Sequence, residues 1–476
     1  MRSPIFFLIA IVAGAIVFGI ALLFRNDYVF FAGYVVLQFI VLATAWNILG
    51  GYCGYVNFGS AAFFALGAYS SVALHKFNPM KAVLQICLGR HCTGEMSFAF
   101  LAPLFPLPVP TLVLIGGIVS GMIGLGMGYL TLRLRGAFFA IATLALAVVL
   151  QTMVVNWDYV GGSRGAYILH PNSITIAGLE IGYIQYLFLI MIVLSVIAVT
   201  TARLIERSRL GYGFATIRDD ELAAEACGVP TLRLKLIATT ISGALMGMAG
   251  APFPYYIGYL EPGSAFNLQY GVNSIAMPMI GGTTSWIGPL IGAILLGTLQ
   301  QVATVTISSA VNLLIVGFLL IGFVIMAPNG VVGLVKDFLR ITAPSRLNVN
   351  VLGLLLIAGY CFLVGLGGVI LGLAAAMSSK GTVLVGMGIC ALILSLSYLT
   401  CAYGLLKLQS WSPVLTTVAL AISIPLSFLY IWMDNSLLNV SLEVFGIVFA
   451  IVAIWYLQNP RVKPLYQPMV ERPVTS

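Results

Sequence analysis

Apolar runs long enough to cross a bilayer recur from one end of this chain to the other. A bilayer core needs roughly 20 apolar residues per helix. Hydrophobic residues make up 61% of the chain and charged residues only 8%, whereas soluble domains carry about a quarter charged residues. Backbone groups in lipid must be hydrogen-bonded internally, and the alternating pattern of a barrel is absent. We therefore expect an all-α, polytopic membrane helix bundle.

The apolar pattern predicts about 13–14 spans, including one short or broken helix. The N-terminal run Pro4–Phe24 is too long for the core of a signal peptide and lacks a small-residue cleavage site, so we interpret it as a retained span. If the N-terminus is inside, the basic clusters fall mainly on the cytoplasmic side. The expected spans are 4–24, 28–49, 57–77, 109–132, 136–155, 183–202, 236–257, the short piece 270–281, 287–305, 309–327, 350–372, 383–405, 411–432 and 438–457.

A basic segment that contains proline, at residues 328–349, divides the chain. Before it the spans are irregular and interrupted by glycine, and after it come four regular spans joined by short loops. We expect a first domain at residues 1–340 and a four-span membrane module at residues 341–476. The second module could be regulatory, a scaffold or an inert fusion.

The loop QICLGRHC contains Cys87 and Cys92, and the topology places it outside the cell. Exported space permits disulfides, so a Cys87–Cys92 bridge is a hypothesis. Together with His91 beside them, the two cysteines are candidate metal ligands, but three ligands so close in sequence make a poor tetrahedral set. We therefore expect no metal site.

Between Arg203 and Lys235 lies the strongest concentration of charge in the chain, with eleven of its thirty-six charged residues. Within this charged island, Asp219-Asp220-Glu221 is typical of the acidic first turn of a helix, and Gly228 followed by Pro230 is typical of a helix end. The pattern predicts a helix of about two turns between two spans. Such a helix, rich in small residues, could dock in a groove of a soluble partner, or it could belong to a plain surface loop.

The segment IRDDELAAEACGV, with the span after it, resembles the cytoplasmic coupling segment of ABC importer permeases of the branched-chain amino acid type, the LivM-like subunit. Four further stretches match in order: GYVNFGSAAFFALGAYS, LRLRGAFFAIATLALA, GGTTSWIGPLIGAILLG and APNGVVGL. The resemblance covers residues from about 25 to 340. It departs from the related importers' EAA signature at Leu222, where those have alanine, and the four-span extension is not part of the usual subunit.

This resemblance implies a multi-pass permease of the bacterial cytoplasmic (inner) membrane, forming the translocation pathway with a second permease subunit. It also implies ATPase subunits inside and a periplasmic or extracellular solute-binding protein outside, with membrane lipid around the spans and no nucleic acid partner. The cargo would be a branched-chain or other hydrophobic amino acid, or urea or a short amide. Carried over to this sequence, the residues that couple to the ATPase are Arg218, Asp219, Glu221, Ala223, Ala224 and Gly228.

The sequence contains no G-x-x-x-x-G-K-[ST] run and no nucleophile motif, so we expect no enzyme activity. ATP and Mg would be used by partner subunits, and we expect this chain to bind no cofactor. A stand-alone channel or secondary carrier is the rival interpretation, although carriers often place ionisable groups along the path, and the first 340 residues have almost none within spans.

Polar side chains within the apolar runs could mark a translocation path, since unpaired polar groups in lipid are unfavourable. They could equally make ordinary hydrogen bonds between helices. The candidates are Asn57, Gln151, Tyr270 and Asn273. Glycine pairs at small-xxx-small spacing, such as Gly117/Gly121 and Gly288/Gly292, predict close helix packing, within the chain or against a subunit.

Overall fold

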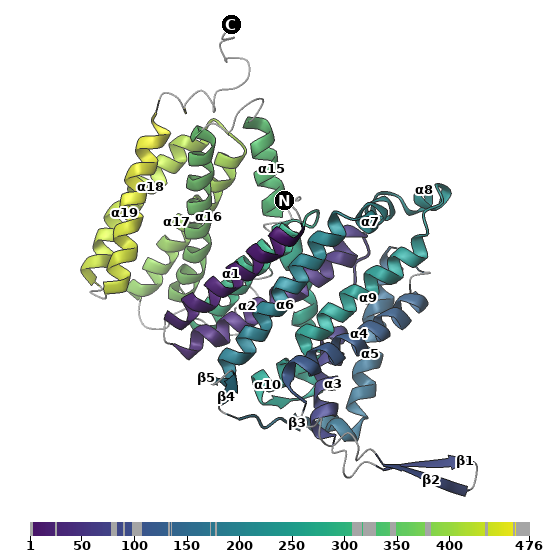
Figure 1. The fold of residues 1–476 in the computed structure, drawn as a ribbon. Helices are drawn as coiled ribbons and strands as arrows, with labels where there is room; N and C mark the ends of the chain where they lie inside the picture. Colours follow the sequence, from purple (N-terminus) through teal and green to yellow (C-terminus); the bar gives the residue numbers. More distant parts are fainter. Residues whose placement is uncertain are drawn as a thin grey trace. The chain divides into compact units, whose positions relative to one another are not determined.

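The fold was analysed in a computed structural model. It describes residues 3–23, 26–77, 83–88, 91–97, 107–131, 136–171, 173–176, 179–306, 330–342, 349–376, 382–433 and 437–459, and the single residues 134, 317 and 462. The chain divides into two compact units, Met1–Thr298 and Leu299–Ser476. Each unit is a bundle of helices (Figure 1).

Long helices in unit 1 match the expected spans closely. They are α1 (Ser3–Leu23), α2 (Asp27–Asn47), α3 (Ser60–Lys76), α4 (Val109–Thr131), α5 (Ala137–Val155), α6 (Tyr183–Glu206), α9 (Thr231–Gly250), α12 (Leu268–Gly281) and α13 (Ile287–Thr306). The division between the two units falls within α13. The short predicted piece at 270–281 is α12, and Pro278 lies inside it.

Short elements connect these helices. They are the π-helix η1 (Ile48–Tyr52), the 3-10 turns η3 (Asp158–Val160) and η4 (Gly162–Arg164), and the helices α7 (Arg209–Asp219), α8 (Glu221–Ala226), α10 (Phe253–Ile257) and α11 (Pro262–Ala265). Three antiparallel pairs complete the set: β1 (Val83–Leu88) with β2 (His91–Ser97), β3 (Ala166–Tyr167) with β6 (Tyr259–Leu260), and β4 (Ser173–Ile176) with β5 (Leu179–Gly182). In Figure 1, α7 and α8 lie at one end of α6 and α9, and β4, β5 and α10 lie at the other.

Unit 2 has its own apolar core. Its helices after α13 are α15 (Gly330–Thr342), α16 (Val349–Ala376), α17 (Thr382–Leu406), α18 (Ser412–Met433) and α19 (Leu437–Leu457). Fully buried side chains from four of them meet in one cluster, including Leu354, Cys401, Leu420 and Ala453. The four helices of the expected module are therefore present, and the two compact units divide at residue 298. The domain boundary expected at residue 340 stays a prediction. The roles assigned to the two domains stay predictions.

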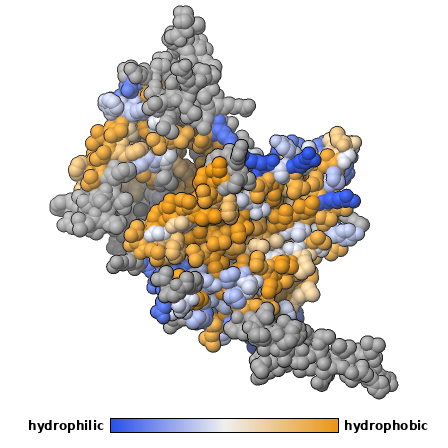
Figure 2. Space-filling model, in the orientation of Figure 1, coloured by the Kyte–Doolittle hydropathy of each residue, from blue (hydrophilic) through white to orange (hydrophobic). Residues whose placement is uncertain are grey.

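The prediction of an all-α polytopic membrane bundle is confirmed. Among the described residues, seven helices are long and apolar enough to cross a membrane, and four shorter helices are also apolar. On the face of unit 1 seen in Figure 2, apolar surface covers the helices, with hydrophilic surface at the ends. The span expected at 309–327 lies outside the described residues, apart from residue 317.

Glycines bring helix α9 into backbone contact with two neighbouring helices, α3 and α4. A Cβ atom on Gly67 of α3 would lie 1.9 Å from the carbonyl oxygen of Gly247. A Cβ on Gly250 would lie 1.9 Å from the carbonyl oxygen of Phe64, and one on Gly247 would lie 2.6 Å from that of Gly116 on α4. Helices α3, α4 and α9 are thus locked together as one group, which agrees with the packing role predicted for small residues.

Strands β1 and β2 contain the cysteine loop. Their register pairs Cys87 with Cys92 across the hairpin. The side chains of both cysteines lie outside the described residues, so the disulfide stays a hypothesis.

Candidate functional site

The charged island folds into a helical corner formed by α7 and α8. Ser208 caps α7, because its hydroxyl accepts a hydrogen bond from the Gly211 amide at 3.4 Å. Asp220 then interrupts the helix with an extended backbone (φ −159°, ψ 110°). Its carboxylate accepts hydrogen bonds from the amides of Leu222 at 2.9 Å and Ala223 at 3.1 Å, so Asp220 is the N-cap of α8.

Gly228 ends α8 as the sequence predicts. Its φ of +81° lies in the left-handed region that glycine adopts without strain. Its amide donates to the carbonyl of Glu225 at 2.9 Å, and the Val229 amide donates to that of Ala224 at 3.0 Å. These two bonds form a Schellman motif, and Pro230 follows it. The predicted short helix is therefore present and capped at both ends.

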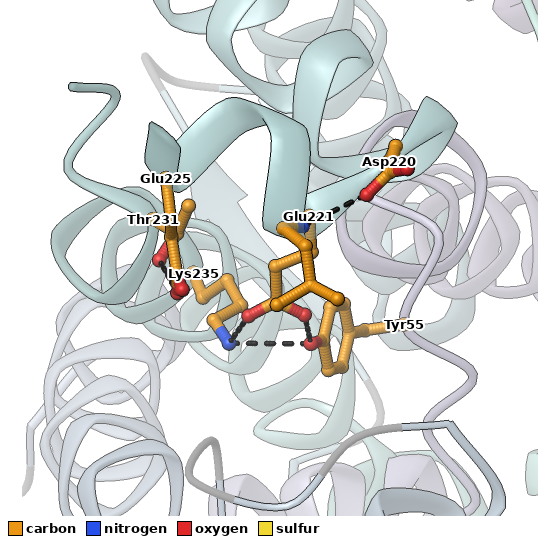
Figure 3. A network of polar contacts seen from close by, with 7 residues as sticks. Tyr55, Asp220, Glu221, Glu225, Thr231 and Lys235 are labelled. Carbon is orange, nitrogen blue, oxygen red and sulfur yellow. Dashed lines mark hydrogen bonds and ion pairs between the residues drawn. The ribbon is translucent and has the colours of Figure 1, made fainter. Parts of the chain in front are cut away.

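Glu221 points from α8 into the bundle (Figure 3). Its carboxylate forms an ion pair with Lys235 of α9, with Nζ 2.7 Å from Oε1, and the two side chains are only 12% and 3% exposed. The hydroxyl of Tyr55 donates to the second carboxylate oxygen. Lys235 Nζ also lies 3.2 Å from that hydroxyl. We refer to Glu221, Lys235 and Tyr55 as the triad.

Tyr55 belongs to the chain between η1 and α3, residues 53–59, which we refer to as the interruption segment. The corner contacts this segment a second time: Gly54 has φ +80°, and a Cβ there would lie 3.0 Å from Cγ of Arg218. The segment also carries Asn57, whose carboxamide oxygen accepts from the Gly59 amide at 2.7 Å. The backbone oxygen of Asn57 accepts from Trp46 Nε1 at 2.9 Å. The helical path is thus interrupted at this segment, between the end of η1 and the start of α3.

A cavity of about 360 Å³ lies beside the interruption segment. One side of it comes from the start of α5, and Glu221 contributes from α8. Its lining residues are Gly54, Tyr55, Val56, Phe58, Gly136, Ala137, Ala140 and Glu221.

The structure separates the six residues predicted to couple into an outward and an inward set. Arg218 and Asp219 pair with each other at 3.2 Å on the surface, with side chains 36% and 72% exposed. Ala223 and Gly228 are also exposed. Ala224 is buried and Glu221 faces the triad. The exposed apolar side chains of the corner are Tyr212, at 72%, and Leu222, at 63%.

Three of the four predicted path residues come near one another. Phe58, next to Asn57, places its carbonyl oxygen 3.7 Å from where a Cβ on Gly271 would lie. Gly271 stands between Tyr270 and Asn273 on α12. Tyr270 stacks on Phe64 with ring centroids 4.5 Å apart, and Asn273 is buried.

Gln151 stands apart from this group. The Phe58 amide donates to Thr143 of α5 at 3.2 Å, and Gln151 lies about two turns farther along that helix. Its side chain is half-buried. The path assignments of all four residues stay predictions.

Sequence reasoning missed both partners of Glu221. Lys235 stands in the first turn and a half of a span, where it reads as one more basic residue of the island, although its side chain is buried. A lysine at the start of an apolar run, with an acidic residue upstream, is the signal that could have identified the pair. Buried Asn47 was also missed.

No group of three or more His, Cys, Asp or Glu residues suited to a metal ion occurs among the described residues.

Comparison with known proteins gives a family match and several relatives. Residues 28–324 match the family described as branched-chain amino acid transport system / permease component. The high-affinity branched-chain amino acid transport system permease protein LivM of Salmonella typhimurium is 25% identical over 326 residues, covering 64% of this chain and 69% of the relative. LivM of Escherichia coli matches equally. The ribose import permease protein RbsC of Haemophilus influenzae is 24% identical over 249 residues, covering 50% and 73%. No solved structure matches.

Proposed function

Since the chain belongs to the family of branched-chain amino acid transport system permease components, we propose that it is the membrane subunit of an ATP-driven ABC importer for branched-chain or other hydrophobic amino acids. Separate ATPase subunits hydrolyse ATP with Mg at the inner face. A second permease subunit completes the pathway, and a solute-binding protein delivers the amino acid from outside the bacterial inner membrane.

The α7–α8 corner is the observation that carries this proposal. Two long apolar helices, α6 and α9, enter and leave it, so a displacement of the corner reaches two spans at once. The corner presents Tyr212, Leu222 and the Arg218–Asp219 pair to solvent. An exposed leucine on a short helix capped at both ends suits a hydrophobic groove on a soluble protein.

The aromatic surroundings of Tyr270 favour an apolar cargo. Its ring lies against Phe64 and Phe253, with centroids 4.5 and 5.7 Å away, and Phe39 is 6.4 Å away. These rings give the surroundings of Tyr270 an apolar character, which suits an aliphatic side chain. The name of LivM supports the same choice.

Sugar import is the second candidate, because ribose and autoinducer 2 import permeases are also among the relatives. Urea or a short amide is a further cargo to compare. Proteoliposomes that contain the whole complex, with its ATPase and binding protein, distinguish these cargoes. We expect ATP-dependent uptake of leucine and none of ribose or urea.

Leu222→Asp tests the docking surface. The change places a charge on an exposed apolar contact, so the ATPase should no longer co-purify and ATP-driven uptake should be lost. The amount of permease in the membrane should stay the same, because the Leu222 side chain is largely exposed. Full co-purification and uptake in this variant would support the stand-alone channel or carrier instead.

A further inference from the structure

We infer, building on the proposed function, that the triad relays the movement of α8 to the interruption segment, and that this segment is the inner gate of the path. Glu221, Lys235 and Tyr55 are then positioning residues inside the permease. Glu221 in particular is not part of the surface that the ATPase touches.

Glu221 and the buried Ala224 are the inward members of α8, whose other residues are exposed. Leu222 and Ala223 face solvent, whereas the Glu221 carboxylate is held by both Lys235 and Tyr55. A side chain fixed in this way transmits the displacement of its helix to the bundle and is not available to contact the ATPase. Glu225 adds a parallel connection between α8 and α9, because the Thr231 hydroxyl donates to its carboxylate at 2.8 Å (Figure 3).

Lys235 carries the first branch of the relay. It belongs to α9, which glycine contacts lock to α3 and α4. A pull on Lys235 therefore moves three helices as a group and leaves little room for local adjustment, since close-packed interiors transmit strain.

Tyr55 carries the second branch. It stands two positions before Asn57 and three before Phe58, whose backbone contacts Thr143 of α5 and approaches Gly271 of α12. The ring of Tyr55 lies edge-on to Phe139 of α5, with centroids 5.0 Å apart. A shift of Tyr55 consequently alters the contacts between the segment and the two helices that carry the path candidates.

The cavity supplies the space that such a shift requires. It is bounded by Tyr55, Val56 and Phe58 on one side and by the start of α5 on the other. Packed interiors move between discrete arrangements, not continuously, so an empty volume beside a short non-helical segment marks where the second arrangement fits. The π-helix η1 directly before the segment is a further irregularity of the type found at functional sites.

Two variants of the full transporter, in proteoliposomes, test the relay. Tyr55→Phe removes one hydroxyl and keeps the ring. The double variant Glu221→Gln/Lys235→Met removes both charges together, so that no buried charge is left without its partner. We expect the ATPase to co-purify in normal amounts, and leucine transported per ATP hydrolysed to fall by about tenfold, within the usual range of coupling between sites.

A gate also has to change its exposure with nucleotide. Val56→Cys, introduced as the single cysteine, reports this through its rate of thiol labelling with and without ATP and vanadate. With the triad intact, we expect nucleotide to change the rate severalfold, and in both triad variants we expect the two rates to be equal.

Asp220→Asn is the matched control. It makes the same acid-to-amide change one position before Glu221, and asparagine caps a helix as well as aspartate. Transport per ATP should therefore stay at the level of the unaltered protein. A loss as large as that of the triad variants would attribute the effect to charge on α8 and overturn the relay.

Other outcomes separate the relay from the proposed function. Failure of the unaltered chain to bind any ATPase overturns the proposed function. A transporting complex in which the triad variants keep their nucleotide-dependent labelling overturns the relay alone. Loss of ATPase binding in Glu221→Gln/Lys235→Met would make Glu221 a docking residue after all.

Discussion

Gly228 shows how one backbone angle sets the shape of the corner. A side chain at this position has open space around it, because a Cβ there would meet nothing within 4 Å. The requirement for glycine comes from φ +81°, which places the Cβ of an L-residue close to its own carbonyl.

Replacement of Gly228 is therefore predicted to follow backbone strain, not side-chain volume. Gly228→Ala should destabilise the C-terminal end of α8 by about 1–2 kcal/mol and weaken ATPase co-purification. Gly228→Asn, although larger, should do less harm because asparagine tolerates the left-handed region. The check is quantitative co-purification of the two variants beside the unaltered chain. Greater loss with asparagine than with alanine would show that volume decides.

At the same scale, the sequence predicted where α8 begins and ends better than the direction of its side chains. The run Asp219-Asp220-Glu221 predicts the start of a helix, but the sequence alone does not distinguish the roles of three adjacent acidic residues. The structure gives them three tasks: Asp219 pairs with Arg218, Asp220 caps α8 and Glu221 enters the bundle. That division depends on Lys235, 14 residues away, and such tertiary pairing is invisible to local patterns.

Helices α3, α4 and α9 are held together by close glycine contacts. Their spans were predictable because each is an apolar run of bilayer length. Which glycines touch was not predictable, since small-xxx-small spacing occurs on many helix faces and only packing selects one. Among these three helices, Gly67, Gly247 and Gly250 make the closest approaches. In the predicted pair Gly117/Gly121, a Cβ on Gly117 would meet Met248 and a Cβ on Gly121 would meet Ala244, both on α9.

Gly247→Ala should weaken this group of helices. The added Cβ would lie 2.3 Å from Cβ of Ser120 and 2.6 Å from the carbonyl oxygen of Gly116, and overpacking of this kind costs about 1–3 kcal/mol. We expect a melting temperature several degrees lower for the purified protein in detergent. Gly126→Ala is the control on α4, because a Cβ there meets nothing within 4 Å. Equal melting temperatures for the two variants would contradict the packing argument.

For the whole molecule, the two units raise the question of what unit 2 contributes. The family match ends at residue 324, whereas α16 to α19 bury a cluster of their own. A core of its own is a mark of a separately folding domain, and the sequence suggested it only through the change from irregular to regular spans.

A chain that ends at residue 345 retains the whole family match, and we expect it to support ATP-driven leucine uptake within about threefold of the full chain, because domains with separate cores usually fold alone. Uptake per ATP hydrolysed in proteoliposomes is the measurement. A drop to background with normal membrane insertion would assign residues 346–476 a part in transport.

The buried position of Lys235 also constrains how the protein is made. A ribosome translates Tyr55 180 residues before Lys235 and Glu221 14 residues before it. Both partners have therefore emerged when the lysine enters the translocon, and its ammonium group can be neutralised as its helix leaves for the lipid. Because both partners precede Lys235 in the sequence, they are available to its ammonium group while α9 is inserted into the membrane.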